Sequence, residues 1–163
     1  MIKVKDKIVT LKEATVIAQK ARRQGKVVVV TNGCFDLLHP GHVRSLEWAR
    51  AQGDILIVAL NSDASVKKNK GPHRPIISAR DRALVLAGLM SVDYVYVFSS
   101  KLAATSYKKI KPNIWVKGSD VKTHPDFIFT KTVVESGGGN VRFCPLFPGR
   151  STTNVIKSIQ GHK

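Results

Sequence analysis

Two histidines and a carboxylate lie close together in one short segment, Thr31–His42 (TNGCFDLLHPGH). His39 and His42 are three residues apart, and Asp36 precedes them. Imidazole N–H groups can donate to oxygens on which charge builds during phosphoryl or nucleotidyl transfer. Pro40 suits the first turn of a helix, and the N-terminus of a helix attracts phosphate through its free N–H groups and its dipole. The segment therefore predicts an anion site at a helix start.

Two other interpretations of the histidine pair stay open at this point. One histidine could cap the helix while the other packs, which is the usual role of such a pair. The pair could also bind a metal ion, but Asp36 is the only further ligand nearby, and a closed site needs four. The Gly-x-Phe-Asp sequence directly upstream and the strand-loop-helix context favour phosphate, because motif and context then agree.

The segment is positioned by a strand before it and a helix after it. Val27–Thr31 is short, β-branched and apolar on both faces, as in a parallel strand buried between helices. From Gly41 onward, apolar residues recur at helical spacing. Gly33 and Gly41 allow the backbone to approach a ligand closely.

The rest of the chain alternates strands with helices. A capping box, Thr10-Leu11-Lys12-Glu13, opens a helix that runs to about Arg23 and is closed by Gly25. Further strands are expected at 54–60, 93–98, 114–116 and 140–144, with a basic loop at 67–75 and helices at 78–90, 102–110, 127–136 and 152–159.

This alternation predicts an α/β fold, a Rossmann-like doubly wound five-stranded parallel sheet. Its ligands should lie beyond the carboxyl ends of the strands at the topological switch point. We expect a single domain over 1–163, with an N-terminal helical extension at 1–25 and a core at 26–160.

Composition favours a globular protein. Hydrophobic residues make up 43% of the 163 residues, no apolar run approaches the roughly 18 residues of a membrane span, and residues 1–6 lack the apolar stretch of a signal peptide. We therefore expect a cytoplasmic location without membrane association. Cys34 and Cys144 have no metal-ligand spacing, and no activating base accompanies Cys34, so we interpret it as a packing residue.

The net charge of +16, from 27 Lys and Arg against 11 Asp and Glu, is the feature that could indicate a nucleic-acid-binding protein. The charge is spread along the chain, with no compact basic helix and no aromatic-interleaved RNA motif. We expect no specific nucleic-acid partner. Part of the charge would serve phosphates, and weak binding to nucleic acid at low salt would be uninformative.

The chain resembles the cytidylyltransferase-like nucleotidyltransferases, whose signature is H-x-G-H. Further blocks follow in family order: Asn61-Ser62-Asp63, Val66 to Gly71, Arg74-Pro75, Arg82, Val116 to Asp120, and Gly149 to Asn154. Within the family it is most similar to the ADP-heptose synthase branch. Leu146 and Arg150 stand where glycerol-3-phosphate cytidylyltransferases usually carry an arginine and an apolar residue.

The resemblance implies that ATP and Mg²⁺ are used to adenylylate D-glycero-β-D-manno-heptose 1-phosphate, giving ADP-heptose and pyrophosphate for a lipopolysaccharide or surface-glycan pathway. It makes His39, His42, Lys67 and Asp36 the catalytic residues. Nucleotide binding falls to Asn32, Gly33, Cys34, Phe35, Gly41, Lys117, Gly118, Asp120, Ser151, Thr152 and Thr153. Binding of the second substrate falls to Asp36, Asn61, Asp63, Lys67, Lys70, Arg74 and Arg82.

Several of these residues also have simpler interpretations. Ser151 to Thr153 could only cap the last helix, Lys67 and Lys70 could belong to a solvated loop, and Arg82 could form an ion pair on a helix surface. If functional, the two lysines would close over the phosphates as mobile charges.

Alternatives for the whole chain are a related enzyme using CTP or another phosphorylated alcohol, such as glycerol 3-phosphate, phosphoethanolamine or FMN, and a noncatalytic basic binding protein. We expect a stand-alone adenylyltransferase without a fused kinase, and a homodimer.

Overall fold

The structure, a computed structural model, describes residues 3–100, 102–119, 125–145 and 152–161, except the side chains of residues 153, 154, 157 and 160. A five-stranded, wholly parallel sheet forms its centre, with the strand order β3-β2-β1-β4-β5. The fold predicted from the sequence is confirmed. The strands are β1 (Val28–Gly33), β2 (Ile55–Asn61), β3 (Tyr94–Phe98), β4 (Ile114–Gly118) and β5 (Asn140–Cys144).

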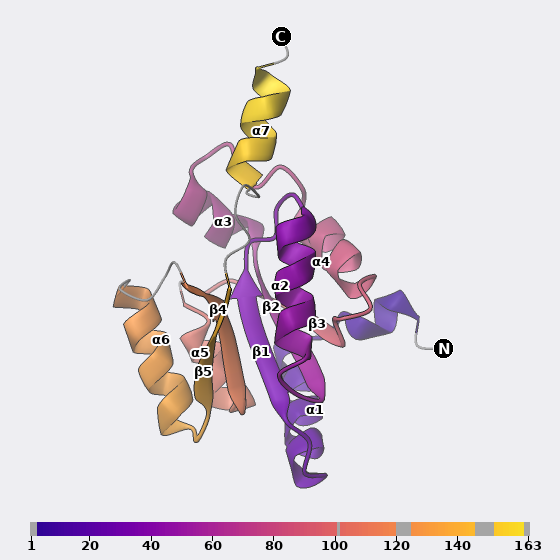
Figure 1. Ribbon diagram of the computed structural model, residues 1–163, viewed down its shortest axis with the longest axis vertical. Coiled ribbons are helices and arrows are strands. Elements are labelled where there is room, and N and C mark those ends of the chain that lie inside the picture. Colours follow the sequence, from indigo (N-terminus) through magenta and orange to yellow (C-terminus); the bar gives the residue numbers. More distant parts are fainter. Residues whose placement is uncertain (1–2, 101, 120–124, 146–151, 162–163) are drawn as a thin grey trace.

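Helices cover both faces of this sheet (Figure 1). The helical elements are a 3₁₀ turn (Val4–Lys7), α1 (Leu11–Arg23), α2 (Pro40–Arg50), α3 (Asp63–Lys70), α4 (Ala79–Ala87), α5 (Ala104–Ile110), α6 (Pro125–Ser136) and α7 (Thr152–Gln160). Of these, α3 and α7 stand at the carboxyl edge of the sheet and not on its faces (Figure 1). None of the helices in the described ranges is long and apolar enough to span a bilayer.

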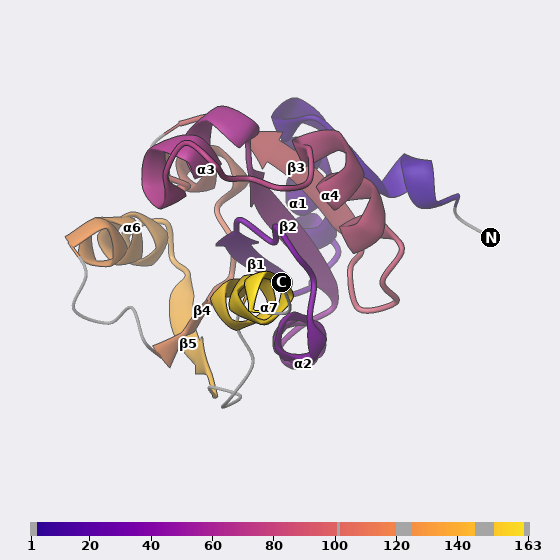
Figure 2. The same cartoon turned by 90° about the horizontal axis from the view of Figure 1, so that it is seen from above.

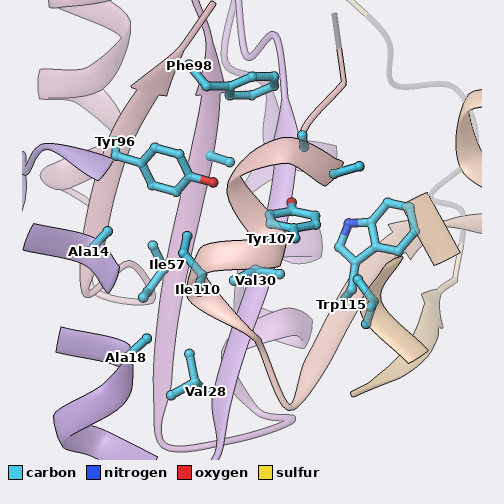
Figure 3. Packing of buried hydrophobic residues seen from close by; sticks show 14 of the residues in the cluster. Ala14, Ala18, Val28, Val30, Ile57, Tyr96, Phe98, Tyr107, Ile110 and Trp115 are labelled. Atoms are coloured by element: carbon cyan, nitrogen blue, oxygen red, sulfur yellow. The ribbon is translucent and has the colours of Figure 1, made fainter. Parts of the chain in front are cut away.

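Two hydrophobic clusters, one on each face, hold the layers together. The first joins α1, α5 and α6 to the sheet, and Figure 3 shows Tyr96, Tyr107 and Trp115 among its larger members. The second joins α2 and α4 to the opposite face. Successive side chains of a strand point to opposite faces, so Val28 and Val30 enter the first cluster and Val29 the second.

The N-terminal helix is part of this core. Thr10 caps α1 with the predicted capping box: its hydroxyl accepts from the Glu13 N–H at 3.2 Å, and the Glu13 carboxylate accepts from the Thr10 N–H at 2.7 Å. Ala14 and Ala18, fully buried, bring the helix close to the sheet. The division between 1–25 and 26–160 stays a prediction, and α1 packs within the same cluster as α5 and α6.

The carboxyl ends of the strands meet at one edge of the sheet, where β1 lies between β2 and β4. The chain crosses from one side of the sheet to the other at β1, which makes the gap between β1 and β4 the switch point. β1 runs to Gly33, two residues beyond the predicted end, because Asn32 and Gly33 still pair with β2. The Thr31–His42 segment therefore leaves the sheet at this edge, as the sequence predicts.

Candidate active site

The two histidines lie together at the start of α2. His39 is the N-cap residue, but its side chain makes no capping hydrogen bond to the helix. The rings of His39 and His42 stack with centroids 3.8 Å apart and an interplanar angle of 29°. Phe35 packs against His42 with ring centroids 5.3 Å apart. The capping interpretation of His39 is therefore not supported, and both imidazoles occupy the helix N-terminus beside Pro40.

The environment of His42 keeps its ring neutral. Burial, and secondarily the neighbouring His39, lowers the pKa of His42 from 6.5 to about 4. Its Nδ1 atom is buried and makes no hydrogen bond within the described part of the chain. A buried lone pair costs less than a buried N–H without an acceptor, so the favoured tautomer carries its proton on Nε2. His42 thus offers a neutral N–H donor.

The start of α7, near the C-terminal end of the sequence, contacts the loop that carries the histidines. The Thr152 hydroxyl at the start of α7 donates to the Leu37 carbonyl at 3.3 Å, and Figures 1 and 2 show α7 standing above the carboxyl edge of the sheet. Thr152 therefore lies next to the histidine loop, and its contact with a nucleotide stays a prediction. Asp120, Ser151, Leu146 and Arg150 lie outside the described residues, as does the side chain of Thr153.

The Asp36 carboxylate makes its contacts with other residues of the chain. Its side chain is 1% exposed and pairs with the Arg74 guanidinium, while it also accepts from the N–H groups of Ile76 at 2.8 Å and Ile77 at 3.1 Å. Burial raises the pKa of this carboxyl, but the hydrogen bonds from Ile77, Arg74 and Ile76 outweigh burial and lower it overall. Asp36 therefore ties the segment after α3 to the histidine loop. Its contact with phosphate or metal stays a prediction, as does that of Arg74.

Arg82 has a similar supporting position. Its side chain is 1% exposed and donates to the Asp63 carboxylate at 2.6 Å, to the Ile77 carbonyl at 2.9 Å and to the Cys34 carbonyl. The ion pair considered from the sequence is present, but the Arg82 side chain is buried and only Asp63, whose side chain is 44% exposed, reaches the surface. These contacts join the segments that follow β1 and β2. Direct contact of Arg82 or Asp63 with a substrate remains a prediction.

The basic segment predicted as a loop at 67–75 is helical over 67–70, whereas 71–75 lies outside any helix or strand. Lys67 and Lys70 belong to α3, which Ser62 caps by accepting from the Ser65 N–H at 3.3 Å. The prediction failed because a helix of eight residues with three lysines and little apolar periodicity gives a weak signal. Both lysines are exposed, and α3 stands at the carboxyl edge of the sheet (Figures 1 and 2). The helix holds them there, so they do not belong to a mobile loop.

A pocket of about 270 Å³ opens on the other side of β1 from the histidines. It contains five of the residues predicted from the sequence, which come from three neighbouring strand ends: Asn32, Gly33, Cys34, Asn61 and Lys117. Its walls are Asn32, Gly33, Cys34, Asn61, Asn69, Phe98, Leu102, Ala103, Trp115, Lys117, Asp126, Phe127 and Thr130. An aromatic wall with scattered amide, hydroxyl and charged groups is suited to a small polar ligand.

Several residues of this pocket were missed by sequence reasoning. Trp115 precedes the recognised Lys117 by two positions on β4 and therefore points to the same face of the sheet. That alternation was the available signal. Asn69, Asp126 and Thr130 come from α3 and α6, and only the packing of those helices brings them to the pocket.

Within 3–100, 102–119, 125–145 and 152–161, no group of three or more His, Cys, Asp or Glu side chains could hold a metal ion. The nearest carboxylate to the histidines in sequence, Asp36, is paired with Arg74. Mg²⁺ prefers oxygen ligands and usually binds through substrate phosphates and water, so the donors that fit it here are those of a bound triphosphate.

Comparison with known proteins agrees with this geometry. Residues 30–157 match the family model described as cytidylyltransferase-like. The chain belongs to this family. It is also 49% identical over 143 residues to the bifunctional protein HldE of Syntrophotalea carbinolica and 48% identical over 142 residues to that of Geobacter metallireducens. These matches cover 88% and 87% of this chain but only 29% and 28% of the relatives, so the chain spans less than a third of their length.

Solved structures support the fold. A lipopolysaccharide core biosynthesis protein from Thermoplasma volcanium superposes with a TM-score of 0.62 at 24% identity, covering 76% of this chain and 98% of that one. A pantoate-beta-alanine ligase from Francisella tularensis gives 0.59 at 15% identity over 94% of this chain and 76% of that one. The family resemblance inferred from the sequence is confirmed, including its likeness to the ADP-heptose synthase branch. The chain is therefore a domain of the nucleotidyltransferase type.

Proposed function

We propose that this chain transfers AMP from ATP to D-glycero-β-D-manno-heptose 1-phosphate, giving ADP-heptose and pyrophosphate. The observation that carries the proposal is the two-sided arrangement at the end of β1. The stacked histidines and the start of α2 lie on one side, and the polar, aromatic pocket lies on the other. Two anionic ligands could meet over the strand end from opposite directions, which suits an in-line displacement.

In the proposed reaction, an oxygen of the sugar phosphate attacks the α-phosphorus of ATP. A new bond forms between that oxygen and the α-phosphorus, and the bond from the α-phosphorus to the oxygen bridging to the β-phosphate breaks. Pyrophosphate leaves with the electron pair of that bond. The nucleophile is already an anion, so the protein needs no general base to create it.

The residues near β1 would then position and neutralise the phosphates. His39 and His42, with the N-terminus of α2, would donate to the triphosphate oxygens on which charge accumulates. Lys67 and Lys70 would supply further positive charge from α3. Mg²⁺, bound with ATP, would neutralise part of the triphosphate charge. Gly33 and Gly41, with Cys34 and Phe35, would let the loop backbone approach the nucleotide.

The identity of the sugar rests on the likeness to the HldE proteins and to the ADP-heptose synthase branch. An ADP-heptose product would place the chain in lipopolysaccharide or related surface-glycan synthesis. Since the chain matches less than a third of those relatives, any second activity of theirs is no part of the proposal. A cytoplasmic homodimer is the form we propose for the active protein.

The test is pyrophosphate release by the purified protein with Mg²⁺. ATP and CTP are each combined with heptose 1-phosphate, glycerol 3-phosphate, phosphoethanolamine and FMN. We expect turnover with ATP and heptose 1-phosphate only. Turnover with CTP or another acceptor would replace the proposed substrates with those of a sister branch, and no turnover in any combination would contradict the catalytic proposal.

A further inference from the structure

The amide of Asn32 is held in one orientation at the end of β1. Its Oδ1 atom accepts two hydrogen bonds, one from the Trp115 indole Nε1 at 3.1 Å and one from the Tyr107 hydroxyl at 3.2 Å. An indole N–H can only donate, so the atom that it meets must be the carbonyl oxygen of the amide. The indole N–H therefore determines which end of the Asn32 amide is the oxygen, a choice that for many amides has to be assigned by assumption.

The two donors that hold Asn32 are themselves rigid. The Tyr107 side chain, from α5, and Trp115, from β4, are 1% and 2% exposed, and their rings meet edge to face with centroids 5.9 Å apart. Val30, two residues before Asn32 on the same face of β1, packs in the same cluster, as Figure 3 shows. Phe127 stacks on Trp115 with ring centroids 5.3 Å apart. Asn32 is thus clamped by a packed aromatic group.

Because Oδ1 is occupied by Tyr107 and Trp115, the Nδ2 atom is the part of the Asn32 amide that can bind a ligand in the pocket. Asn32 lines the pocket, and the hydrogen bonds recorded within the described ranges leave its Nδ2 without a protein acceptor. Two N–H donors at that position can serve a ligand oxygen. They cannot serve a ligand donor unless the amide turns over, and turning over would place Nδ2 against the Trp115 N–H.

The surroundings of Asn32 favour an anionic oxygen. Lys117 and Asp126 both belong to the pocket wall. Next to Asn32, three cations (Lys70, Arg82 and Arg74) and one carboxylate (Asp36) act electrostatically on the thiol of Cys34, although burial dominates and raises the pKa of that thiol. Cations therefore outnumber carboxylates at this corner. A phosphate at this corner would meet positive charge, while the aromatic side of the pocket remains for the sugar.

We infer that Asn32 is a specificity-determining residue whose Nδ2 donates to the phosphate of the sugar-phosphate substrate, and that Tyr107 and Trp115 are positioning residues that hold its amide in the donating orientation. This inference rests on the proposed function and assigns Asn32 to the second substrate instead of to ATP, where sequence reasoning placed it. The histidine side of β1 is left to the triphosphate.

The first variant is Asn32→Asp, which keeps an oxygen for Tyr107 and Trp115 but replaces the donor with an anion. Heptose 1-phosphate and ATP are titrated separately by calorimetry, and both KM values are measured where turnover occurs. We expect Kd and KM for heptose 1-phosphate to rise about ten- to a hundredfold, since a hydrogen bond to a charged group is lost and repulsion is added. The values for ATP should stay within about twofold.

The second variant is Tyr107→Phe, matched with Tyr96→Phe. Both tyrosines are buried in the same cluster, but the Tyr96 hydroxyl bonds to Ser106 at 2.7 Å and not to Asn32. We expect Tyr107→Phe to raise KM for heptose 1-phosphate about three- to tenfold with little change in kcat. Tyr96→Phe should leave that KM unchanged. In an Asn32→Ala background, the effect of Tyr107→Phe on KM should disappear.

Each outcome decides the inference. Unchanged heptose 1-phosphate binding in Asn32→Asp would show that Asn32 serves only to satisfy its two aromatic donors. A rise in the ATP constants instead would assign Asn32 to the nucleotide, and a Tyr107→Phe effect that persists without Asn32 would remove the positioning role. If the wild-type protein binds heptose 1-phosphate without turnover, the proposed function fails while the calorimetric comparison still tests Asn32. No binding by the wild-type protein overturns both.

Discussion

At the scale of single residues, His39 and His42 carry the strongest claim about catalysis. Their rings stack at the N-terminus of α2, where a bound triphosphate would face both imidazoles. Replacing His39 with alanine removes a donor that acts as charge builds on the phosphates, so we expect kcat to fall about 10²- to 10³-fold. Steady-state kinetics with circular dichroism checks both rate and fold. Glu47→Ala, an exposed position on the same helix, is the matched control and should leave kcat unchanged.

The neutral state of His42 predicts a pH-dependent stability. In the unfolded chain its pKa is 6.5, and in the folded protein it is about 4. Between these two pH values the unfolded state binds more protons than the folded state. The stabilisation of the folded protein by the neutral His42 ring is therefore complete above pH 6.5 and is lost as the pH falls toward 4. We expect His42 to account for about 1 kcal/mol of unfolding free energy between pH 7 and 5, reduced from the full linkage value by partial exposure.

Urea denaturation of the wild-type protein and His42→Asn at pH 7 and pH 5 measures this contribution. The variant should lose less stability than the wild-type protein over that interval. Equal losses in the two proteins would mean that the His42 ring titrates normally in the folded state.

At the scale of elements, Gly71 determines where α3 ends. Gly71 has φ 98° and ψ 169°, a conformation that is essentially restricted to glycine, and a Cβ there would meet no atom within 4 Å. Gly71→Ala should therefore cost about 1–3 kcal/mol through backbone strain alone. Gly88→Ala is the comparison, because Gly88 has φ −71° and ψ −15° and its added Cβ would meet the carbonyl oxygens of Val85 at 3.3 Å and Leu84 at 3.6 Å. Thermal unfolding should show a clearly smaller loss for Gly88→Ala; equal losses would refute the strain.

Helix α1 belongs to the core, as the burial of its small side chains indicates. Ala18 is fully buried against the sheet, and a larger side chain there would force the helix away from its neighbours. We expect Ala18→Leu to lower the free energy of unfolding by about 1–3 kcal/mol, as overpacking usually does. Val16→Leu, on the same helix at a position 56% exposed, should change it by less than about 0.5 kcal/mol. Similar values for both variants in denaturant titrations would mean that α1 is only loosely attached.

The elements also show what sequence can and cannot predict here. Buried strands such as Val28–Gly33 and the capped helix at Thr10 were predictable because their signals are local: apolar runs and cap residues. Helix α3 was not predictable. Ser62 and Gly71 are suitable residues for its N-cap and C-cap, but the lysines between them leave too little apolar periodicity to indicate a helix. The histidine motif was predictable from its spacing. The clamp on Asn32 was not, since Tyr107 comes from a distant helix and only packing brings it there.

At the scale of the whole molecule, the sheet edge gathers groups from distant parts of the chain. The end of β1 supplies Asn32 and the histidine loop, β4 supplies Trp115 and Lys117, and the start of α7 contacts the loop through Thr152. The topology explains this gathering, because parallel strands on either side of a switch point all end at one edge. In the proposed reaction, the two substrates would bind on opposite sides of β1.

The central claim is that an oxygen of a sugar phosphate attacks the α-phosphorus of ATP. The most direct measurement uses heptose 1-phosphate with ¹⁸O in its non-bridging phosphate oxygens, unlabelled ATP and Mg²⁺, followed by ³¹P NMR and mass spectrometry of the products. We predict that ADP-heptose carries all of the label, part of it in the oxygen bridging its two phosphorus atoms, and that pyrophosphate carries none. Label in pyrophosphate, or no ADP-sugar formed, would contradict the account.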